Sequence, residues 1–255
     1  MIERTVNVAS ADGLIETFIS HPRGNGPFPA IILYMDVWGV REELFDIARR
    51  IATTGYYCMV PDLYYRFGKV RHNFRDAKNQ MISMEILDEA RKELVRGTMR
   101  KLSDTMVVSD TGALLDFIDR GEPVRPGALG AIGYCMGGRH VFCAAGSFPL
   151  RFRASASLHG TRLVTDGPDS PHLIALKAEG ELYCGFAEKD PYAALPTIKA
   201  IAAAMQGARV KYHYELHQGA DHGYALPDRD IHDKQAANRD WELMFAMWRR
   251  QMPPA

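Results

Sequence analysis

The cysteine in Gly133-Tyr134-Cys135-Met136-Gly137 has the sequence surroundings of a nucleophile. Glycines two residues before and two residues after a nucleophile allow a sharp, strained turn that lifts its side chain above a sheet. A helix behind the turn supplies N–H groups and a positive dipole end, which favour a thiolate. The segment therefore indicates a nucleophile elbow with cysteine in place of serine. A buried structural cysteine before a glycine-rich turn is the alternative.

An acid and a histidine follow in the chain order that such an elbow requires, nucleophile, acid and then base. Asp190 comes after an apolar run at 182–186, and its Asp-Pro step forms a turn that can fix the carboxylate. Glu188 is the rival acid in the same loop. His222 lies in the glycine-flanked segment 218–223, just past another strand pattern, where ligands bind in sheets of parallel strands.

The other histidines compete less well for the role of base. Each falls on or next to a strand, inside a helix or after a proline in a loop: His213, His217, His140 and His172. His159 ends the strand pattern 154–158 before a glycine. Lining the pocket and a capping or packing role are equally open for it.

The apolar pattern predicts a sheet that can position these residues. Two β-favouring runs, 5–9 and 14–20, join at Asp12-Gly13, which is a hairpin signal. A continuously apolar strand over 30–35, a helix over 42–54 and a strand over 56–60 then form a βαβ unit.

Further helices and strands alternate after this unit. The pattern predicts helices over 104–120, from 136, over 195–205 and over 236–250, and strands over 129–134, 154–158, 182–186 and 209–216. Residues 66–100 carry many charges and methionines, so we expect a helical excursion near the active site. The fold class is α/β: one domain over 1–255, with a mostly parallel sheet, helices on both faces and an N-terminal hairpin.

The amino-acid composition excludes some classes of binding partner. The 255 residues carry 31 Lys+Arg and 31 Asp+Glu, with a pI near 7.1, which argues against nucleic acid. No stretch approaches the roughly 18 apolar residues of a membrane helix, and the first residues lack the apolar core of a signal peptide. The four cysteines show no spacing typical of zinc or disulfides. We expect a cytoplasmic monomer or homodimer that binds a small molecule and needs no cofactor or metal.

With these residues in view, the chain resembles the dienelactone hydrolase family of α/β-hydrolases. Four segments agree in order and spacing: 35–40 (MDVWGV), 60–64 (VPDLY), 133–138 (GYCMGG), and the Asp190 and His222 loops. The resemblance implies a triad of Cys135, Asp190 and His222. It also implies an oxyanion hole formed by the backbone N–H groups of Val37 and Met136.

The resemblance further implies roles for an acid and for arginines. The family usually has a glutamate where this chain has Asp36, and that acid takes part in switching the thiol to the thiolate. Members acting on dienelactone bind the substrate carboxylate through arginines, one of them four residues after the triad histidine. Leu226 stands there instead, and the possible substitutes are Arg229, Arg66, Arg71, Arg75 and Arg139.

The implied activity is hydrolysis of small esters or lactones through a Cys135 thiolate and an acyl-enzyme. Two alternatives stay open: a broad carboxylesterase or thioesterase on the same triad, and a non-catalytic homologue that binds a ligand or senses oxidants. Aromatic and imidazole side chains are expected either to wall the pocket or to belong to the core: Trp38, Tyr64, Tyr134, His159 and Tyr224.

Overall fold

One eight-stranded sheet organises the computed structural model, which describes residues 1–254. The strands are β1 (Ile2–Ser10), β2 (Gly13–His21), β3 (Phe28–Tyr34), β4 (Tyr57–Pro61), β5 (Val124–Tyr134), β6 (Phe152–Leu158), β7 (Glu181–Lys189) and β8 (Tyr212–Asp221). The α-helices are α1 (Glu42–Thr53), α2 (Glu89–Lys101), α3 (Asp104–Asp119), α4 (Met136–Ser147), α5 (Pro171–Ala175), α6 (Leu195–Gly207) and α7 (Lys234–Gln251). Two 3₁₀ turns lie at Tyr65–Phe67 and Met84–Ile86.

The strand order is β1-β2-β4-β3-β5-β6-β7-β8. β2 pairs antiparallel with both β1 and β4, and every pairing from β4 across to β8 is parallel. The predicted N-terminal hairpin and mostly parallel sheet are therefore confirmed.

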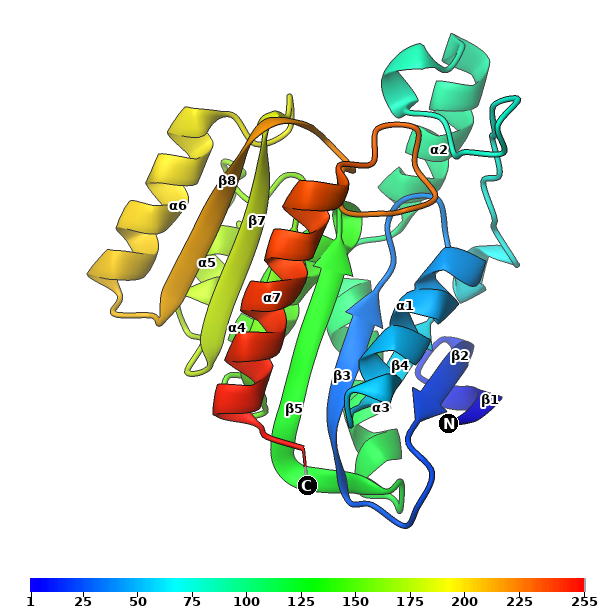
Figure 1. Cartoon of the computed structure of the whole chain (residues 1–255), viewed down its shortest axis with the longest axis vertical. Helices are drawn as coiled ribbons and strands as arrows, with labels where there is room; N and C mark the ends of the chain where they lie inside the picture. Colours follow the sequence, from blue (N-terminus) through cyan, green and yellow to red (C-terminus); the bar gives the residue numbers. More distant parts are fainter. Residues whose placement is uncertain (255) are drawn as a thin grey trace.

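Helices cover both faces of the sheet. In Figure 1, α1 and α7 lie in front of the strands, whereas α3 and α4 lie behind them. α5 packs beside α4, and α6 packs against α5 and β8. The carboxyl ends of β3, β5 and β7 point to the top of the view, where α2 and the loop after β8 also lie (Figure 1). This end of the sheet is the place for a site.

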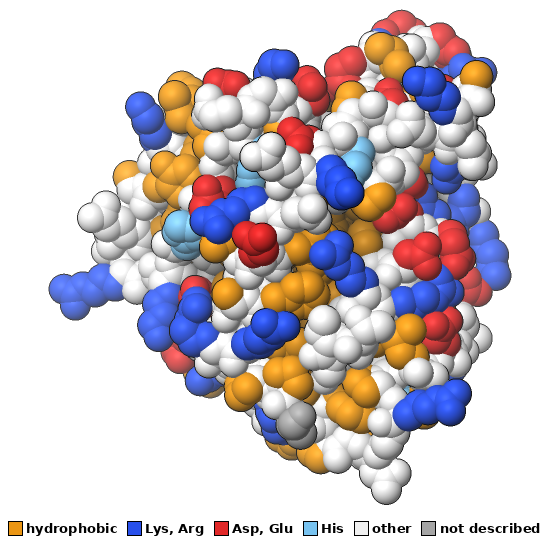
Figure 2. Space-filling view, viewed as in Figure 1, with side chains coloured by type: hydrophobic (Ala, Val, Ile, Leu, Met, Phe, Trp, Pro, Cys, Tyr) orange, Lys and Arg blue, Asp and Glu red, His pale blue; other side chains and the backbone are white. Residues whose placement is uncertain are grey.

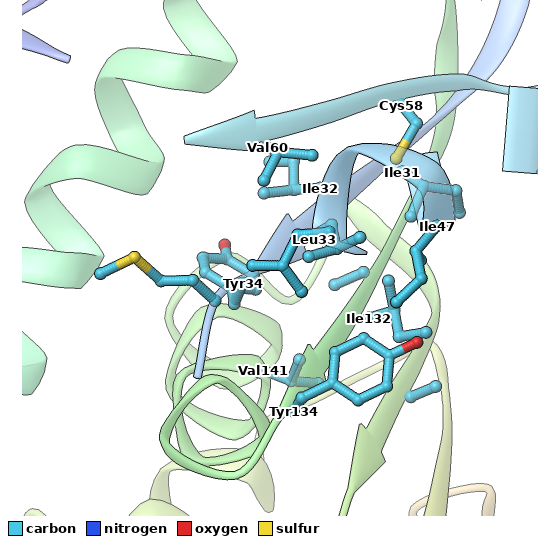
Figure 3. Packing of buried hydrophobic residues seen from close by; sticks show 14 of the residues in the cluster. Ile31, Ile32, Leu33, Tyr34, Ile47, Cys58, Val60, Ile132, Tyr134 and Val141 are labelled. Carbon is cyan, nitrogen blue, oxygen red and sulfur yellow. The ribbon is translucent and has the colours of Figure 1, made fainter. Parts of the chain in front are cut away.

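The centre of the sheet is apolar because its strands are covered on both faces. In β3, residues 30–34 are fully buried. Figure 3 shows Ile31, Ile32 and Leu33 of this strand among side chains from β4, β5, α1 and α4. α1 buries Leu44, Ile47, Ala48 and Ile51, which are the positions that its helical spacing predicts. The rigid floor of the site comes from this packing.

Three parts of the chain differ from the sequence prediction. The segment 66–100 is helical only in its second half, and residues 68–83 are largely irregular. Met81 there donates its N–H to the Asp228 carbonyl, 2.7 Å away, and accepts from Asp230, which straps the segment to the loop after β8. The short helix α5 was not predicted. β8 continues through a bulge to Asp221, so His222 follows the strand directly.

Charged side chains of both signs are interspersed over the molecular face in Figure 2, around a strip of apolar side chains along its middle. This distribution agrees with the equal numbers of acidic and basic residues. Among residues 1–254, none of the helices combines the length and apolarity needed to cross a bilayer.

Candidate active site

Cys135 sits in a strained turn between β5 and α4. Its φ of 54° and ψ of −115° lie where a non-glycine residue is rarely found, and such strain costs on the order of 1–3 kcal/mol. A Cβ added at Gly133 would come within 2.1 Å of the Gly137 carbonyl oxygen, and one at Gly137 within 2.2 Å of the Tyr34 carbonyl oxygen. Glycine is therefore required at both positions, as the predicted elbow demands.

Backbone hydrogen bonds hold this turn in place. The Cys135 N–H donates to the Leu158 carbonyl at 3.0 Å, and the Cys135 carbonyl accepts from Gly138 and Thr161. The end of β6, the first turn of α4 and the loop after β6 thus hold the backbone of Cys135 in place.

His222 and Asp190 meet above the carboxyl ends of β7 and β8. His222 Nδ1 lies 2.8 Å from Asp190 Oδ2, and the other carboxylate oxygen accepts the N–H of Tyr192 at 2.8 Å. Because Nδ1 is occupied by Asp190, Nε2 is the nitrogen available to Cys135, which lines the same cavity as His222. The structure therefore brings together all three predicted triad residues.

The environment of His222 favours its charged form. Burial by itself lowers the pKa of His222, but the negative charge of Cys135 and the hydrogen bond to Asp190 outweigh it and raise the pKa to about 10. An imidazolium beside a thiolate is the resting arrangement of activated cysteine nucleophiles.

Glu188, the rival acid, has a different partner. Its carboxylate accepts the N–H of Gly219 at 2.8 Å, in the bulge of β8, and its side chain is exposed. Glu188 therefore shapes the strand that leads to His222, and Asp190 holds the imidazole.

The two predicted oxyanion donors, Val37 and Met136, are both close to Cys135 in the fold. Met136 is the first residue of α4, so its N–H has no acceptor within the helix. Val37 lines the same cavity as Cys135, in the loop after β3. Tyr64 supports this loop from below, because its hydroxyl donates to the Val37 carbonyl at 3.1 Å.

The Asp36 carboxylate binds Arg41, whereas the family resemblance implies that it acts on the Cys135 thiol. Its two carboxylate oxygens accept from the Arg41 guanidinium at 2.8 and 3.0 Å, and one also accepts the Trp38 N–H. Arg41 in turn binds Asp228. Within residues 1–254, no hydrogen bond joins Asp36 to Cys135. The shorter side chain is thus tied into an ion-pair network that shapes the Val37 loop.

A cavity of about 130 Å³ opens beside Cys135 and His222. Its walls come from the loop after β3, from α2 and the turn before it, and from the loops after β6, β7 and β8. The lining residues are Val37, Trp38, Met84, Glu85, Val95, Arg96, Met99, Cys135, Thr161, Arg162, Tyr192, His222 and Arg229. The segment 66–100 therefore lines this cavity, mainly through α2.

The predicted pocket aromatics need correction. Trp38 lines the cavity, but Tyr64, Tyr134, His159 and Tyr224 are fully buried and do not. These rings belong to the core, because burying a large aromatic surface stabilises the fold. His159 lies edge-on to the His222 ring, with centroids 5.0 Å apart, so it packs against His222.

Tyr192 and the methionines of the cavity were not singled out in the sequence. The Tyr192 ring packs edge-on against the His222 ring, with centroids 4.8 Å apart, so both Tyr192 and His159 contact this imidazole. Its position two residues after Asp190 was the available signal. Met84 and Met99 carry no such signal, because they reach the site only through the path of the segment 66–100.

Arg229 is the buried cation of the cavity. Only 3% of its surface is exposed, its guanidinium lies over the Trp38 ring at 5.2 Å, and its Nε has no hydrogen-bond partner within residues 1–254. Buried charges normally have a partner of opposite sign. An anionic ligand group in the cavity would supply one.

The other four arginines considered as ligands for a substrate carboxylate each lie beside an acidic side chain of the protein. Arg66 binds Asp110 and Asp12, Arg71 binds Asp62, Arg75 lies near Asp228, and Arg139 binds Asp104. For metals, the described part of the chain has no group of three or more His, Cys, Asp or Glu side chains placed to hold an ion.

A sequence profile of the dienelactone hydrolase family matches residues 15–252. The chain belongs to the dienelactone hydrolase family. It is accordingly a hydrolase of the carboxylic ester class. This membership confirms the resemblance seen in the motifs, which runs over nearly the whole chain.

Relatives and solved structures of this family agree with the match. A "putative carboxymethylenebutenolidase" of Methylorubrum extorquens is 26% identical over 255 residues, covering 98% of this chain and 81% of that protein. A "probable 2-oxo-3-(5-oxofuran-2-ylidene)propanoate lactonase" of Bradyrhizobium is 23% identical, covering 91% of this chain and 88% of that protein. The crystal structure of a "putative dienelactone hydrolase" from Klebsiella pneumoniae is 22% identical, with a TM-score of 0.83 over 97% of this chain and 98% of that one. The last likeness shows the α/β-hydrolase fold.

Proposed function

We propose that this protein hydrolyses small esters or lactones through a thiolate of Cys135. The observation that carries the proposal is the placement of His222, which lies 2.8 Å from Asp190 and lines the same cavity as Cys135. A buried structural cysteine would not need a strained turn or a charged imidazole beside it.

The proposed reaction begins with attack of the Cys135 sulfur on the substrate carbonyl. A carbon–sulfur bond forms, and the carbonyl oxygen becomes an oxyanion that accepts from the N–H groups of Val37 and Met136. Each such donor contributes about 3 kcal/mol in the transition state. The carbon–oxygen bond to the leaving group then breaks, and the leaving oxygen takes a proton from His222.

Water completes the cycle. His222, now neutral, accepts a proton from a water molecule as the water attacks the thioester. The carbon–sulfur bond breaks, the product leaves as a carboxylic acid, and the thiolate and imidazolium are restored. With a lactone, the alcohol and the acid remain parts of one ring-opened molecule.

Arg229 supports a substrate that carries a negative charge. The cavity walls are mainly apolar, with Val37, Trp38, Val95 and methionines around this one buried cation. The Bradyrhizobium relative is named for a lactone that also bears a propanoate group. We therefore propose a small unsaturated lactone with a carboxylate, bound with the carboxylate toward Arg229.

Replacement of the nucleophile tests the reaction. For Cys135→Ala we expect kcat/KM for an aryl ester and for an unsaturated lactone to fall by about 10⁴-fold or more. Steady-state kinetics of both substrates check this. Near-wild-type hydrolysis by the variant would end the proposal. Wild-type turnover of aryl esters without lactones would instead favour a broad carboxylesterase.

Replacement of the buried cation tests the substrate class. Arg229→Gln should raise KM about 10- to 100-fold for a lactone that bears a carboxylate, because a charged hydrogen bond contributes about 1.5–3 kcal/mol. The KM for a neutral aryl ester should change little. Arg162→Gln is the matched control, since Arg162 lines the same cavity but is exposed to solvent. Equal effects of both variants would contradict a specific role for Arg229.

A further inference from the structure

Asp240 lies on α7, and its side chain contacts β7, β8 and the loop after β8. Its carboxylate is fully buried and accepts three hydrogen bonds. Tyr183 and His217 bind Oδ1 at 2.6 and 2.7 Å, and Tyr224 binds Oδ2 at 2.6 Å. None of these four residues lines the cavity beside Cys135. The proposed reaction therefore leaves the cluster unexplained.

Two of the three donors lie on either side of His222. His217 precedes it by five residues on β8, and Tyr224 follows it by two residues in the next loop. The third donor, Tyr183, belongs to β7 and lies near the start of that strand, away from the Asp190 end. One carboxylate thus fixes the strand that enters the His222 segment and the loop that leaves it.

The sheet has room for this cluster only because β7 carries a glycine there. A Cβ added at Gly185 would lie 2.4 Å from the Tyr224 hydroxyl and 2.7 Å from Asp240 Oδ1. The Gly185 carbonyl also accepts the N–H of His159 at 2.7 Å. The same point of β7 therefore supports both the cluster and the residue that packs against His222.

Ring packing connects Tyr224 to the base. The Tyr224 ring lies 5.5 Å from the His159 ring, which lies 5.0 Å from the His222 ring, both in edge-on contact. Burial and the nearby Asp240 raise the pKa of the Tyr224 hydroxyl well above its usual range, so it remains a donor. A shift of Tyr224 would be transmitted to His222 through the chain and through these rings.

We propose that Asp240 and Tyr224 are positioning residues that hold His222 in line with Cys135. The inference rests on the proposed role of His222 as the base. Neither residue touches substrate in this account. Their effect is on the orientation of the imidazole, and misplacement of a catalytic group by about 1 Å can cost on the order of 100-fold in rate.

Two matched variants separate positioning from stability. Tyr224→Phe and Tyr183→Phe each remove one hydroxyl that donates to Asp240 at 2.6 Å, and both keep the ring. Only Tyr224 adjoins His222. We expect both variants to lower the free energy of unfolding by similar amounts in urea. With an aryl ester, Tyr224→Phe should lower kcat about 10-fold or more with KM nearly unchanged, whereas Tyr183→Phe should keep the wild-type kcat.

A second measurement does not depend on turnover. The rate at which iodoacetamide alkylates Cys135, followed against pH, reports the thiolate that His222 stabilises. Tyr224→Phe should slow alkylation at neutral pH and shift the profile, and Tyr183→Phe should leave the profile unchanged. Equal profiles for wild type and Tyr224→Phe, or equal changes in both variants, would overturn the inference. If the wild-type protein hydrolyses no ester, the proposed function fails, but the alkylation profiles still decide the positioning role.

Discussion

At the scale of the residue, the proposed reaction depends on the charge of His222 beside Cys135. Burial opposes a charged imidazole, and the thiolate together with Asp190 overcomes it. A charged imidazole beside a cysteine favours the thiolate form, which is the nucleophile that the proposed reaction requires. Asp36, the third acid considered, contributes to the loop through Arg41 instead.

The His222 pair has a consequence for pH. Its pKa of about 10 in the folded protein exceeds the ordinary value of 6.5. His222 therefore contributes stability that is complete below pH 6.5 and is lost as the pH rises toward 10. We expect His222→Gln to reduce the free energy of unfolding more at pH 6.5 than at pH 10, as measured in urea. A larger reduction in the free energy of unfolding at pH 10 than at pH 6.5 would contradict a charged His222 in the folded protein.

At the scale of the element, the elbow depends on close contact between β5, α4 and the loop after β3. Gly137→Ala places a methyl group 2.2 Å from the Tyr34 carbonyl oxygen, where neither backbone can move easily. We expect a loss of about 1–3 kcal/mol or more in the free energy of unfolding, measured in urea.

Gly112→Ala on α3 is the control for this substitution. The added methyl group would meet only the Phe148 ring, at 3.6 Å, which is ordinary contact. A helical alanine there should stabilise the protein by about 0.5–1 kcal/mol. Equal losses in the two variants would show that the elbow glycine has no special steric role.

The elements that sequence reasoning could predict are those with strong local signals. β3 is continuously apolar and α1 has a regular apolar face, so the sequence predicts the bounds of both to within about two residues. The segment 66–100 has no such pattern because its irregular half is held by contacts with residues 228–230, which are distant in sequence. The same reason explains why the cavity methionines were missed.

The residues of the candidate site also fall into those with a local sequence signal and those that only the folded structure identifies. Cys135, Asp190 and His222 follow strand ends and carry glycine or proline signals, so their convergence could be predicted from topology alone. Arg229 could be named only as one of five arginines, because burial and the lack of a partner are properties of the folded protein. The partners of Asp36 also depend on Arg41 and Asp228 meeting across the site.

At the scale of the whole molecule, one continuous sheet over the described residues 1–254 supports the proposal that 1–255 form a single domain.

The fold exposes Cys135 to a cavity and buries the other three cysteines. Cys58, Cys143 and Cys184 are completely buried, and burial raises the pKa of each thiol, to about 12 for Cys143 and Cys184. Cys135 is 8% exposed and faces the cavity. Only one of the four free thiols is therefore placed to react in the folded protein.

The central claim, an acyl-enzyme on Cys135, is tested most directly by trapping that intermediate. The wild-type protein is mixed with p-nitrophenyl acetate, quenched in acid during turnover, digested and examined by mass spectrometry. We expect one acetyl group on the peptide that carries Cys135, and none on the peptides that carry Cys58, Cys143 or Cys184. Steady hydrolysis with no acetyl group on Cys135, or with acetyl on another residue whose removal stops turnover, would contradict the account.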